Sequence, residues 1–245
     1  MNKIFRSVLV GAAAASIAFI GAGAAGAAPV GNGGATPNIV GGSKAPATPW
    51  AVQLIFQKTG QSGSFGCTGE AISADWVLTA GHCVKGVSGM KVYYSNVTPA
   101  SGENIAVDNF YSQPGNDVAL VHLSKSKQLD SYPALTDSYK VSTSDTGLIM
   151  GYGHRANDAV ADGLYQAKQK VIGSSSDTAG GPAIHLQGVD GSANRGDSGG
   201  PLIIGGKIVG VASTVDSLPG ASTTGKANYA SVTNARQWIK STSGV

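Results

Sequence analysis

Short runs of alternating apolar and polar residues, separated by turn residues, follow one another along most of the chain. Runs bounded by Gly, Pro, Asn, Asp or Ser are typical of β-strands. We expect strands at residues 51–56, 65–73, 75–79, 90–95, 105–110, 117–123, 146–152, 164–172, 183–187, 201–204, 207–213 and 229–232. Many short strands with frequent turns predict a barrel or a sandwich, and the pattern alone does not choose between them.

Two further segments complete the pattern. Gly205 and Gly206 separate two strands and predict a tight two-residue hairpin turn. Residues 234–241 predict one helix, with Trp238 and Ile239 available to pack. The polar segment 129–144 separates the first group of strands from the second.

The N-terminal segment has the features of a targeting sequence. Lys3 and Arg6 precede an apolar run at 8–20, and Ala25-Gly26-Ala27 fits a cleavage site. A membrane anchor is the alternative, but this run is mostly Ala and Gly and less apolar than a spanning helix requires. We therefore predict a signal peptide at 1–27, a secreted product and no membrane association after cleavage.

Charge and cysteine content narrow the class further. The net charge is +3, and Lys3 and Arg6 lie in the predicted signal, so the remainder is near neutral and offers no basic stripe for nucleic acid. Cys67 and Cys83 are the only cysteines. In a secreted chain they predict a disulfide, with two free buried thiols as the alternative. No metal-ligand spacing is recognisable, so we expect no metal ion and no cofactor.

Three motifs carry candidate chemistry. Residues 196–201, Gly-Asp-Ser-Gly-Gly-Pro, suit a tight turn that presents the hydroxyl of Ser198. Serine is a weak nucleophile, so it needs a base and a group that orients the base. Residues 79–83, Thr-Ala-Gly-His-Cys, supply His82, and 116–120, Asn-Asp-Val-Ala-Leu, supply Asp117. The order His, Asp, Ser is one of the known solutions of the catalytic triad.

With Ile-Val-Gly-Gly at 39–42, these motifs make the chain resemble the chymotrypsin/trypsin-like serine peptidases, particularly their secreted bacterial members. The resemblance runs from Ile39 to the C-terminus. It implies an all-β fold of two six-stranded antiparallel β-barrels, at 39–138 and 139–245, with the active site in the cleft between them and a C-terminal helix. It also implies that Cys67 pairs with Cys83.

The resemblance assigns catalytic roles. Ser198 would be the nucleophile, His82 the general base, and Asp117 the group that orients the imidazole. The backbone N–H groups of Gly196 and Ser198 would form the oxyanion hole, and Gly suits the conformation required there.

The resemblance also implies activation by proteolysis. Residues 28–38 would be a short propeptide, and its Gly- and Pro-rich part from Pro29 onward predicts disorder. Cleavage before Ile39 would free an α-ammonium group that pairs with the carboxylate of Asp197. Asn38 precedes the cleavage point, not Arg or Lys, so we expect a separate activating protease or autolysis with an unusual preference.

The family resemblance implies that four residues shape the substrate pocket. Serine at the pocket base gives no charge for Arg or Lys substrates, although Asp190 would lie nearby if the loop shifts. Family members with deep pockets carry glycine at the two outer wall positions. This chain has larger side chains there, which should narrow the pocket. We therefore expect a preference for small or medium apolar residues. The pocket residues are Ser192 at the base and Ser213, Val215 and Ala227 on the walls.

The predicted function is that of a secreted serine endopeptidase, monomeric and acting on protein or peptide substrates. One alternative is a catalytically silent homologue that acts as a binding protein. Another is an esterase with the same triad on a different fold, because residues 196–200 fit G-x-S-x-G. The order His, Asp, Ser argues against that fold, which uses Ser, Asp, His.

Overall fold

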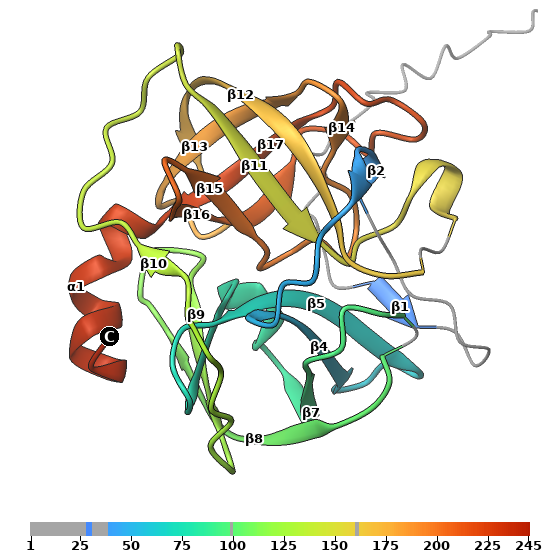
Figure 1. The fold of residues 1–245 in the computed structure, drawn as a ribbon, viewed down its shortest axis with the longest axis vertical. Coiled ribbons are helices and arrows are strands. Elements are labelled where there is room, and N and C mark those ends of the chain that lie inside the picture. Colours follow the sequence, from blue (N-terminus) through green and yellow to red (C-terminus); the bar gives the residue numbers. More distant parts are fainter. Residues whose placement is uncertain (1–27, 31–38, 99, 160–161) are drawn as a thin grey trace, which may run out of the picture.

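The computed structural model describes residues 28–30, 39–98, 100–159 and 162–245 (Figure 1). The predicted signal peptide at 1–27 and most of the predicted propeptide, 31–38, lie outside the described residues. Among the described helices, none is long and apolar enough to cross a membrane.

The first barrel is a closed sheet of six antiparallel strands. Its hydrogen-bonded order is β5-β4-β7-β8-β9-β6, and β6 pairs back to β5. Alternate side chains, such as Leu54, Cys67 and Val77, are buried in the core. The strands are β4 (Ala51–Lys58), β5 (Ser64–Ala71), β6 (Trp76–Thr79), β7 (Val87–Tyr93), β8 (Asn104–Ser112) and β9 (Ala119–Leu123).

The second barrel repeats this architecture above the first in the view of Figure 1. Its order is β16-β15-β11-β12-β13-β17, and β17 pairs back to β16. Gly205 and Gly206 both have positive φ, 59° and 76°, and form the predicted hairpin turn. The strands are β11 (Thr146–Gly151), β12 (Tyr165–Ser176), β13 (Pro182–Gly188), β15 (Pro201–Ile204), β16 (Lys207–Val215) and β17 (Lys226–Ser231). The predicted fold class is confirmed.

Short elements are added to the barrels. β10 pairs with β16 in parallel, β3 pairs with β12, and β2 pairs with β14. These elements are β1 (Ala28–Val30), β2 (Val40–Gly41), β3 (Ser43–Lys44), β10 (Ala134–Leu135), β14 (Gly191–Ser192) and the 3₁₀ turns η1 (Gly81–Cys83) and η2 (Ala156–Asp158).

The expected disorder from Pro29 onward is wrong for Pro29 and Val30, which belong to β1. This strand pairs antiparallel with β5, with Ala28 opposite Gly66. β6 pairs with β5 only at Glu70 and Ala71. The start of β5 therefore has an unpaired edge that accepts another strand.

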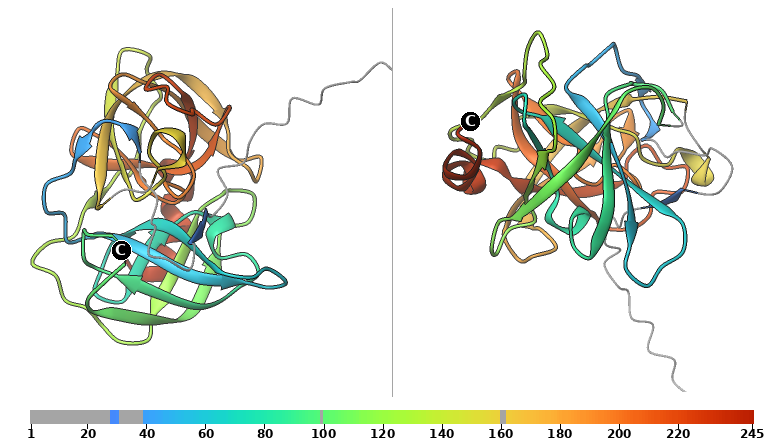
Figure 2. Two further views of the ribbon diagram at one scale, coloured as in Figure 1. Left: turned by 90° about the vertical axis from the view of Figure 1, so that its right-hand side faces the viewer. Right: turned by 90° about the horizontal axis from the view of Figure 1, so that it is seen from below.

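The C-terminal helix α1 (Val232–Ser243) is longer than the predicted 234–241. The hydroxyl of Ser231 accepts the N–H of Asn234 at 3.3 Å and caps its start, and Gly244 ends it with φ of 81°. Its buried residues Val232, Ala235 and Ile239 join the hydrophobic cluster that contains the core of the first barrel. This cluster also contains Ile208, Val211 and Ala230 of the second barrel, so the helix packs with both halves of the chain. In the right-hand view of Figure 2 it lies at one side of the barrels.

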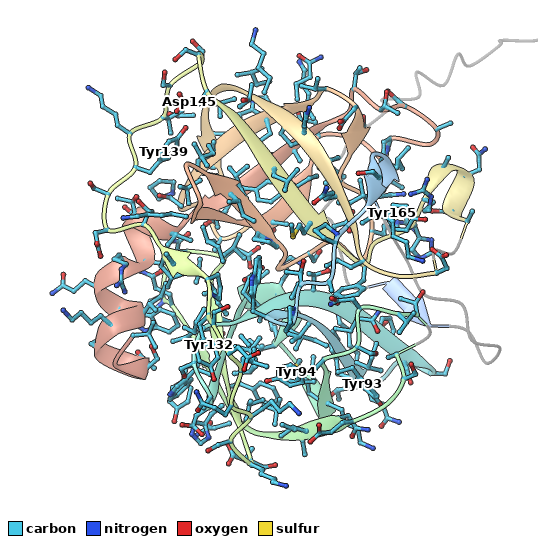
Figure 3. All side chains as sticks on the ribbon, in the orientation of Figure 1. Tyr93, Tyr94, Tyr132, Tyr139, Asp145 and Tyr165 are labelled. Carbon is cyan, nitrogen blue, oxygen red and sulfur yellow. A yellow bond between two sulfur atoms is a disulfide. The ribbon has the colours of Figure 1, made fainter. Side chains whose placement is uncertain are left out.

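The crossover between the barrels is anchored by Tyr139. Its N–H donates to the hydroxyl of Thr233 at 2.7 Å, and its own hydroxyl donates to Asp145 at 2.8 Å (Figure 3). Burial and this carboxylate raise the pKa of Tyr139 to about 12. The crossover is thus tied to α1 on one side and to the start of β11 on the other.

A buried tyrosine, Tyr152, connects the two barrels. Tyr152 follows β11, and its hydroxyl donates to the carbonyl of Ala51 in β4 at 2.8 Å. The same hydroxyl accepts the side-chain amide of Asn96 at 2.8 Å. Burial raises the pKa of Tyr152, so the hydroxyl stays protonated and can donate.

We predict that Tyr152→Phe lowers the free energy of unfolding by about 1–2 kcal/mol, because the two hydrogen bonds of the hydroxyl, to the Ala51 carbonyl and from the Asn96 amide, are lost. Chemical denaturation of the Ser198→Ala protein, which avoids autolysis, measures this change. Tyr165→Phe is the matched control, because its hydroxyl donates to the exposed Asp162. Equal effects of the two variants would contradict the proposed role of Tyr152.

Candidate active site

His82 and Asp117 lie together because their strands are neighbours. β6 leads into η1, which carries His82, and Asp117 lies just before β9; Thr79 of β6 pairs with Ala119 of β9. The backbone N–H of His82 donates to Oδ1 of Asp117 at 2.8 Å, and Nδ1 of His82 lies 2.8 Å from Oδ2. Since a carboxylate only accepts, the proton belongs on Nδ1.

A third donor reaches this carboxylate from the second barrel. The hydroxyl of Ser213, in β16, donates to Oδ2 of Asp117 at 2.6 Å. Asp117 is 2% exposed, so each of these donors offsets the cost of removing its charge from water. The sequence predicts Ser213 only as a pocket-wall residue, and it gives no signal for this contact because no motif links residue 213 to residue 117.

The disulfide between Cys67 and Cys83 is present, as predicted, and excludes the free-thiol alternative. Cys67 lies in β5, and Cys83 directly follows His82 in η1. The bond therefore ties the 3₁₀ turn that carries His82 to a strand of the first barrel. By chain entropy alone such a short loop contributes about 3 kcal/mol to stability.

The loop that carries Ser198 packs against β5 and against the end of β6, the strand that leads to His82. The N–H of Thr68 donates to the carbonyl of Ser198 at 2.9 Å. A Cβ on Gly199 would lie only 2.1 Å from Oγ1 of Thr79 and 3.0 Å from the nitrogen of Ala80, and φ at Gly199 is 82°. Only glycine permits this approach, which brings the loop beside residues 79 and 80.

Gly196, the candidate oxyanion-hole residue, has φ of 88°, a conformation that suits glycine. The hydroxyl of Thr68 donates to its carbonyl at 3.1 Å. Thr68, from the first barrel, therefore binds the carbonyl groups of both Gly196 and Ser198.

Asp197 turns away from Ser198 into the second barrel and is buried. Its Oδ1 accepts the N–H of Gly153 at 2.6 Å, and its Oδ2 accepts the N–H of Asn194 at 2.9 Å. A Cβ on Gly151 or Gly153 would overlap this carboxylate, at 2.2 and 2.3 Å. Among the described residues Asp197 forms no ion pair, and burial raises its pKa to about 7.

The segment that begins at Ile39 is inserted into the second barrel. Ile39 is fully buried, and Val40 pairs with Ser192 between β2 and β14. Arg155 donates to the carbonyl of Gly41 at 3.2 Å. Its guanidinium lies 4.0 Å from the centre of the Tyr165 ring, which Figure 3 labels beside β2.

The predicted pocket residues come from β14, β16 and β17. Val215 and Ala227 are paired between β16 and β17, and each is 2% exposed. The hydroxyl of Ser192 accepts the N–H of Gly225 at 2.7 Å. Asp190 accepts the N–H of Lys168 at 2.7 Å, so its carboxylate is engaged on β12.

A cleft of about 390 Å³ opens beside the His82–Asp117 pair. Lys85, Gln113 and Thr178 also line it. The His82 side chain is 19% exposed. Its Nε2 has no hydrogen-bond partner within the described part of the chain, and such catalytic contacts often tighten only when substrate binds.

Two buried carboxyl groups near the site lie outside all four motifs, so the sequence offered no signal for their roles. Asp177 accepts the backbone N–H of Asp117 at 2.8 Å. Glu70, in β5, is fully buried, and its oxygens have no partner among the described residues. Burial raises the pKa of Glu70 well above its usual range.

Two closed antiparallel barrels with a His–Asp pair between them define a chymotrypsin/trypsin-like serine protease. The family described as Trypsin matches residues 39–239. The chain belongs to the trypsin family.

The relatives support this membership. Trypsin alpha of Drosophila melanogaster is 29% identical, over 83% of this chain and 87% of its own length. Trypsin I-P1 of Gallus gallus is 30% identical, over 83% and 88%. These relatives come from an insect and a bird, so the narrower resemblance to secreted bacterial members is not supported.

Solved structures show the same fold. HL collagenase superposes with a TM-score of 0.71 at 24% identity, covering 84% of this chain and 99% of that chain. An inactivated protease paralogue of the scabies mite superposes with a TM-score of 0.68 at 22% identity, covering 82% and 95%.

We predict that Asp197 makes the uncleaved protein less stable as the pH rises from about 4 to about 7. Its folded-state pKa, about 7, lies above its ordinary value of 3.8, so the folded state binds the proton more tightly and stability is greatest at low pH. Denaturation of uncleaved Ser198→Ala protein across this range measures the slope, and Asp197→Asn should flatten it.

Asp162→Asn is the control for this slope, because Asp162 is exposed and Lys44 lowers its pKa. An unchanged slope in Asp197→Asn would show that another group, such as Glu70, carries the pH dependence.

Proposed function

We propose that this protein is a secreted serine endopeptidase that hydrolyses peptide bonds through an acyl-enzyme. One observation carries the proposal: the paired hydrogen bonds of 2.8 Å from His82 to the buried carboxylate of Asp117, next to the loop of Ser198. This arrangement orients an imidazole whose Nε2 faces away from the carboxylate.

In the first half of the reaction, Oγ of Ser198 attacks the carbonyl carbon of the scissile bond. Its proton passes to Nε2 of His82. The tetrahedral intermediate then collapses, the C–N bond breaks, and His82 returns the proton to the leaving amine. The products of this half are an amine and an ester on Ser198.

In the second half, water attacks the ester carbonyl and gives its proton to His82. Collapse releases the carboxylic acid, and the proton returns to Ser198. Asp117 stays ionised throughout and stabilises the imidazolium.

The backbone N–H groups of Gly196 and Ser198 would bind the oxyanion in both halves. The positive φ of Gly196 supports this role. Loss of one such donor typically lowers the rate by about 10²–10³.

The buried carboxylate of Asp197 supports activation by cleavage before Ile39. Asp197 is buried without a cation among the described residues, although Ile39 lies in the same barrel. A free α-ammonium group at Ile39 would neutralise this carboxylate, and a buried charge is tolerated best when it is paired. Because Asn38 precedes Ile39, a separate activating protease fits this site.

The residues proposed for the substrate pocket favour cleavage after small or medium apolar residues. Val215 and Ala227 face each other across paired strands, and Ser192 offers no charge for a basic side chain. We expect no preference for Arg or Lys, because the residue proposed at the pocket base is a serine.

The remaining assignments complete the proposal. Residues 1–27 are a signal peptide and 28–38 a propeptide, and the two barrels, 39–138 and 139–245, act as one extracellular monomer on protein or peptide substrates. The alternative is a catalytically silent homologue that binds a partner, an idea that the inactivated paralogue with the same fold raises.

The test is to sequence the N-terminus of the secreted protein and to assay chromogenic peptides that end in Ala, Val, Leu, Phe or Arg. We expect an N-terminus at Ile39, cleavage after Ala or Val, no activity in Ser198→Ala, and a loss of about 10⁴ in kcat for Asp117→Asn. A mature protein with a free Ile39 and no activity would instead support the silent homologue.

A second prediction concerns the pocket. Replacing both Val215 and Ala227 with glycine should deepen it and raise kcat/KM for Phe relative to Ala by at least about tenfold, since each buried methylene contributes about 1–3 kcal/mol to discrimination. Val189→Gly is the control, because Val189 is an exposed hydrophobic residue. An unchanged ratio would rule out these two side chains as the pocket walls.

A further inference from the structure

The turn between β12 and β13 is closed around the carboxylate of Asp177. Oδ1 accepts the N–H of Ala179 and the N–H of Gly181, each at 2.8 Å. The N–H of Asp177 donates to the carbonyl of Gly181 at 2.9 Å. Asp177 is only 6% exposed, so the turn is a compact unit with a charged centre.

The second oxygen of this carboxylate leaves the turn and reaches the other barrel. Oδ2 of Asp177 accepts the backbone N–H of Asp117 at 2.8 Å, in a buried contact. A hydrogen bond to an ionised acceptor is roughly twice as strong as a neutral one. The turn therefore holds the main chain of Asp117.

The same turn also acts on the side chain of Asp117. The N–H of Thr178 donates to Oγ of Ser213 at 3.1 Å, and this hydroxyl donates to Oδ2 of Asp117 at 2.6 Å. A hydroxyl has one proton, so a donor on its lone pair leaves that proton for the carboxylate. One turn thus fixes both the backbone and the carboxylate of Asp117.

Close packing reinforces these contacts. A Cβ on Gly181 would lie 2.5 Å from the carbonyl oxygen of Gly115, 2.8 Å from Oδ2 of Asp177 and 3.0 Å from Cα of Asn116. Gly181 therefore lets the turn rest against the chain just before Asp117. A Cβ on the neighbouring Gly180 would have no described atom within 4 Å.

We propose that Asp177 is a positioning residue for the active site: through its turn it sets the place and orientation of Asp117, and through Asp117 the orientation of the His82 imidazole. This inference rests on the proposed peptidase function. It assigns Asp177 no contact with substrate, because its carboxylate is fully engaged by three backbone N–H groups.

The first experiment compares kcat and KM of Asp177→Ala, Asp177→Asn and Gly181→Ala with those of the parent enzyme. We expect kcat to fall about 10- to 100-fold, because small misplacements of catalytic groups have effects of this size, while KM changes by less than about 3-fold. Asn replaces one carboxylate oxygen with an NH₂ donor, so it cannot accept hydrogen bonds both from the turn and from the N–H of Asp117.

Gly181→Ala keeps the carboxylate and separates the turn from residues 115–117, so it tests the idea even if Asp177→Ala fails to fold. Gly180→Asn is its matched control in the same turn, because φ of 85° at Gly180 is tolerated by Asn and its side chain meets open space.

A double-mutant cycle separates positioning from general loss of stability. If Asp177 acts through Asp117, then Asp177→Ala should lower kcat by less than about 2-fold in the Asp117→Ala background. A full 10- to 100-fold loss in that background would overturn the proposal, as would an unchanged kcat in all three turn variants of an active enzyme.

A spectroscopic readout makes the inference independent of activity. The proton that His82 Nδ1 shares with Asp117 should give a far-downfield NMR resonance in Ser198→Ala protein, shifted or lost when Asp177→Ala is added and retained with Gly180→Asn. Absence of Ser198-dependent activity would refute the proposed function alone. An unchanged resonance with Asp177→Ala would refute the positioning role alone.

Discussion

The carboxylate of Asp117 accepts hydrogen bonds from both barrels, and the geometry of the site depends on it. His82 supplies two of these bonds from the first barrel, and Ser213 supplies one from the second. The carboxylate is buried, so the three donors must be in place together for its charge to be tolerated. The hydrogen bond from Ser213 therefore links the second barrel to the His82–Asp117 pair.

Two other buried carboxyl groups near Asp117 differ in how their oxygens are satisfied. Asp177 is satisfied by backbone N–H groups of its own turn and of Asp117. Asp197 accepts two backbone N–H groups and has no cation among the described residues, and burial raises its pKa to about 7. A buried carboxylate with two backbone donors but no counter-charge would be stabilised by a positive charge placed beside it. The proposed cleavage before Ile39 would supply such a charge.

Glycine makes these close approaches possible. Gly199 allows the Ser198 loop to touch the strand that leads to His82, and Gly151 and Gly153 leave room for the carboxylate of Asp197. Gly181 does the same between the β12–β13 turn and residues 115–116. In each case a side chain would push apart two segments that come from different strands, and the polar contacts beside it would lengthen.

Alternation, turn chemistry and motif spacing are local properties, so the main barrel strands, the Gly205-Gly206 hairpin, the C-terminal helix and the motif residues could be predicted from the sequence. The Cys67–Cys83 bond was predictable from the presence of two cysteines in a chain expected to be secreted, and the family resemblance agreed with it. Tertiary structure alone decided the contact of Ser213 with Asp117, the role of Asp177 and the burial of Glu70. These depend on which residues meet across the closed barrels, and no local pattern records a contact between residues 60 or 96 positions apart in the chain.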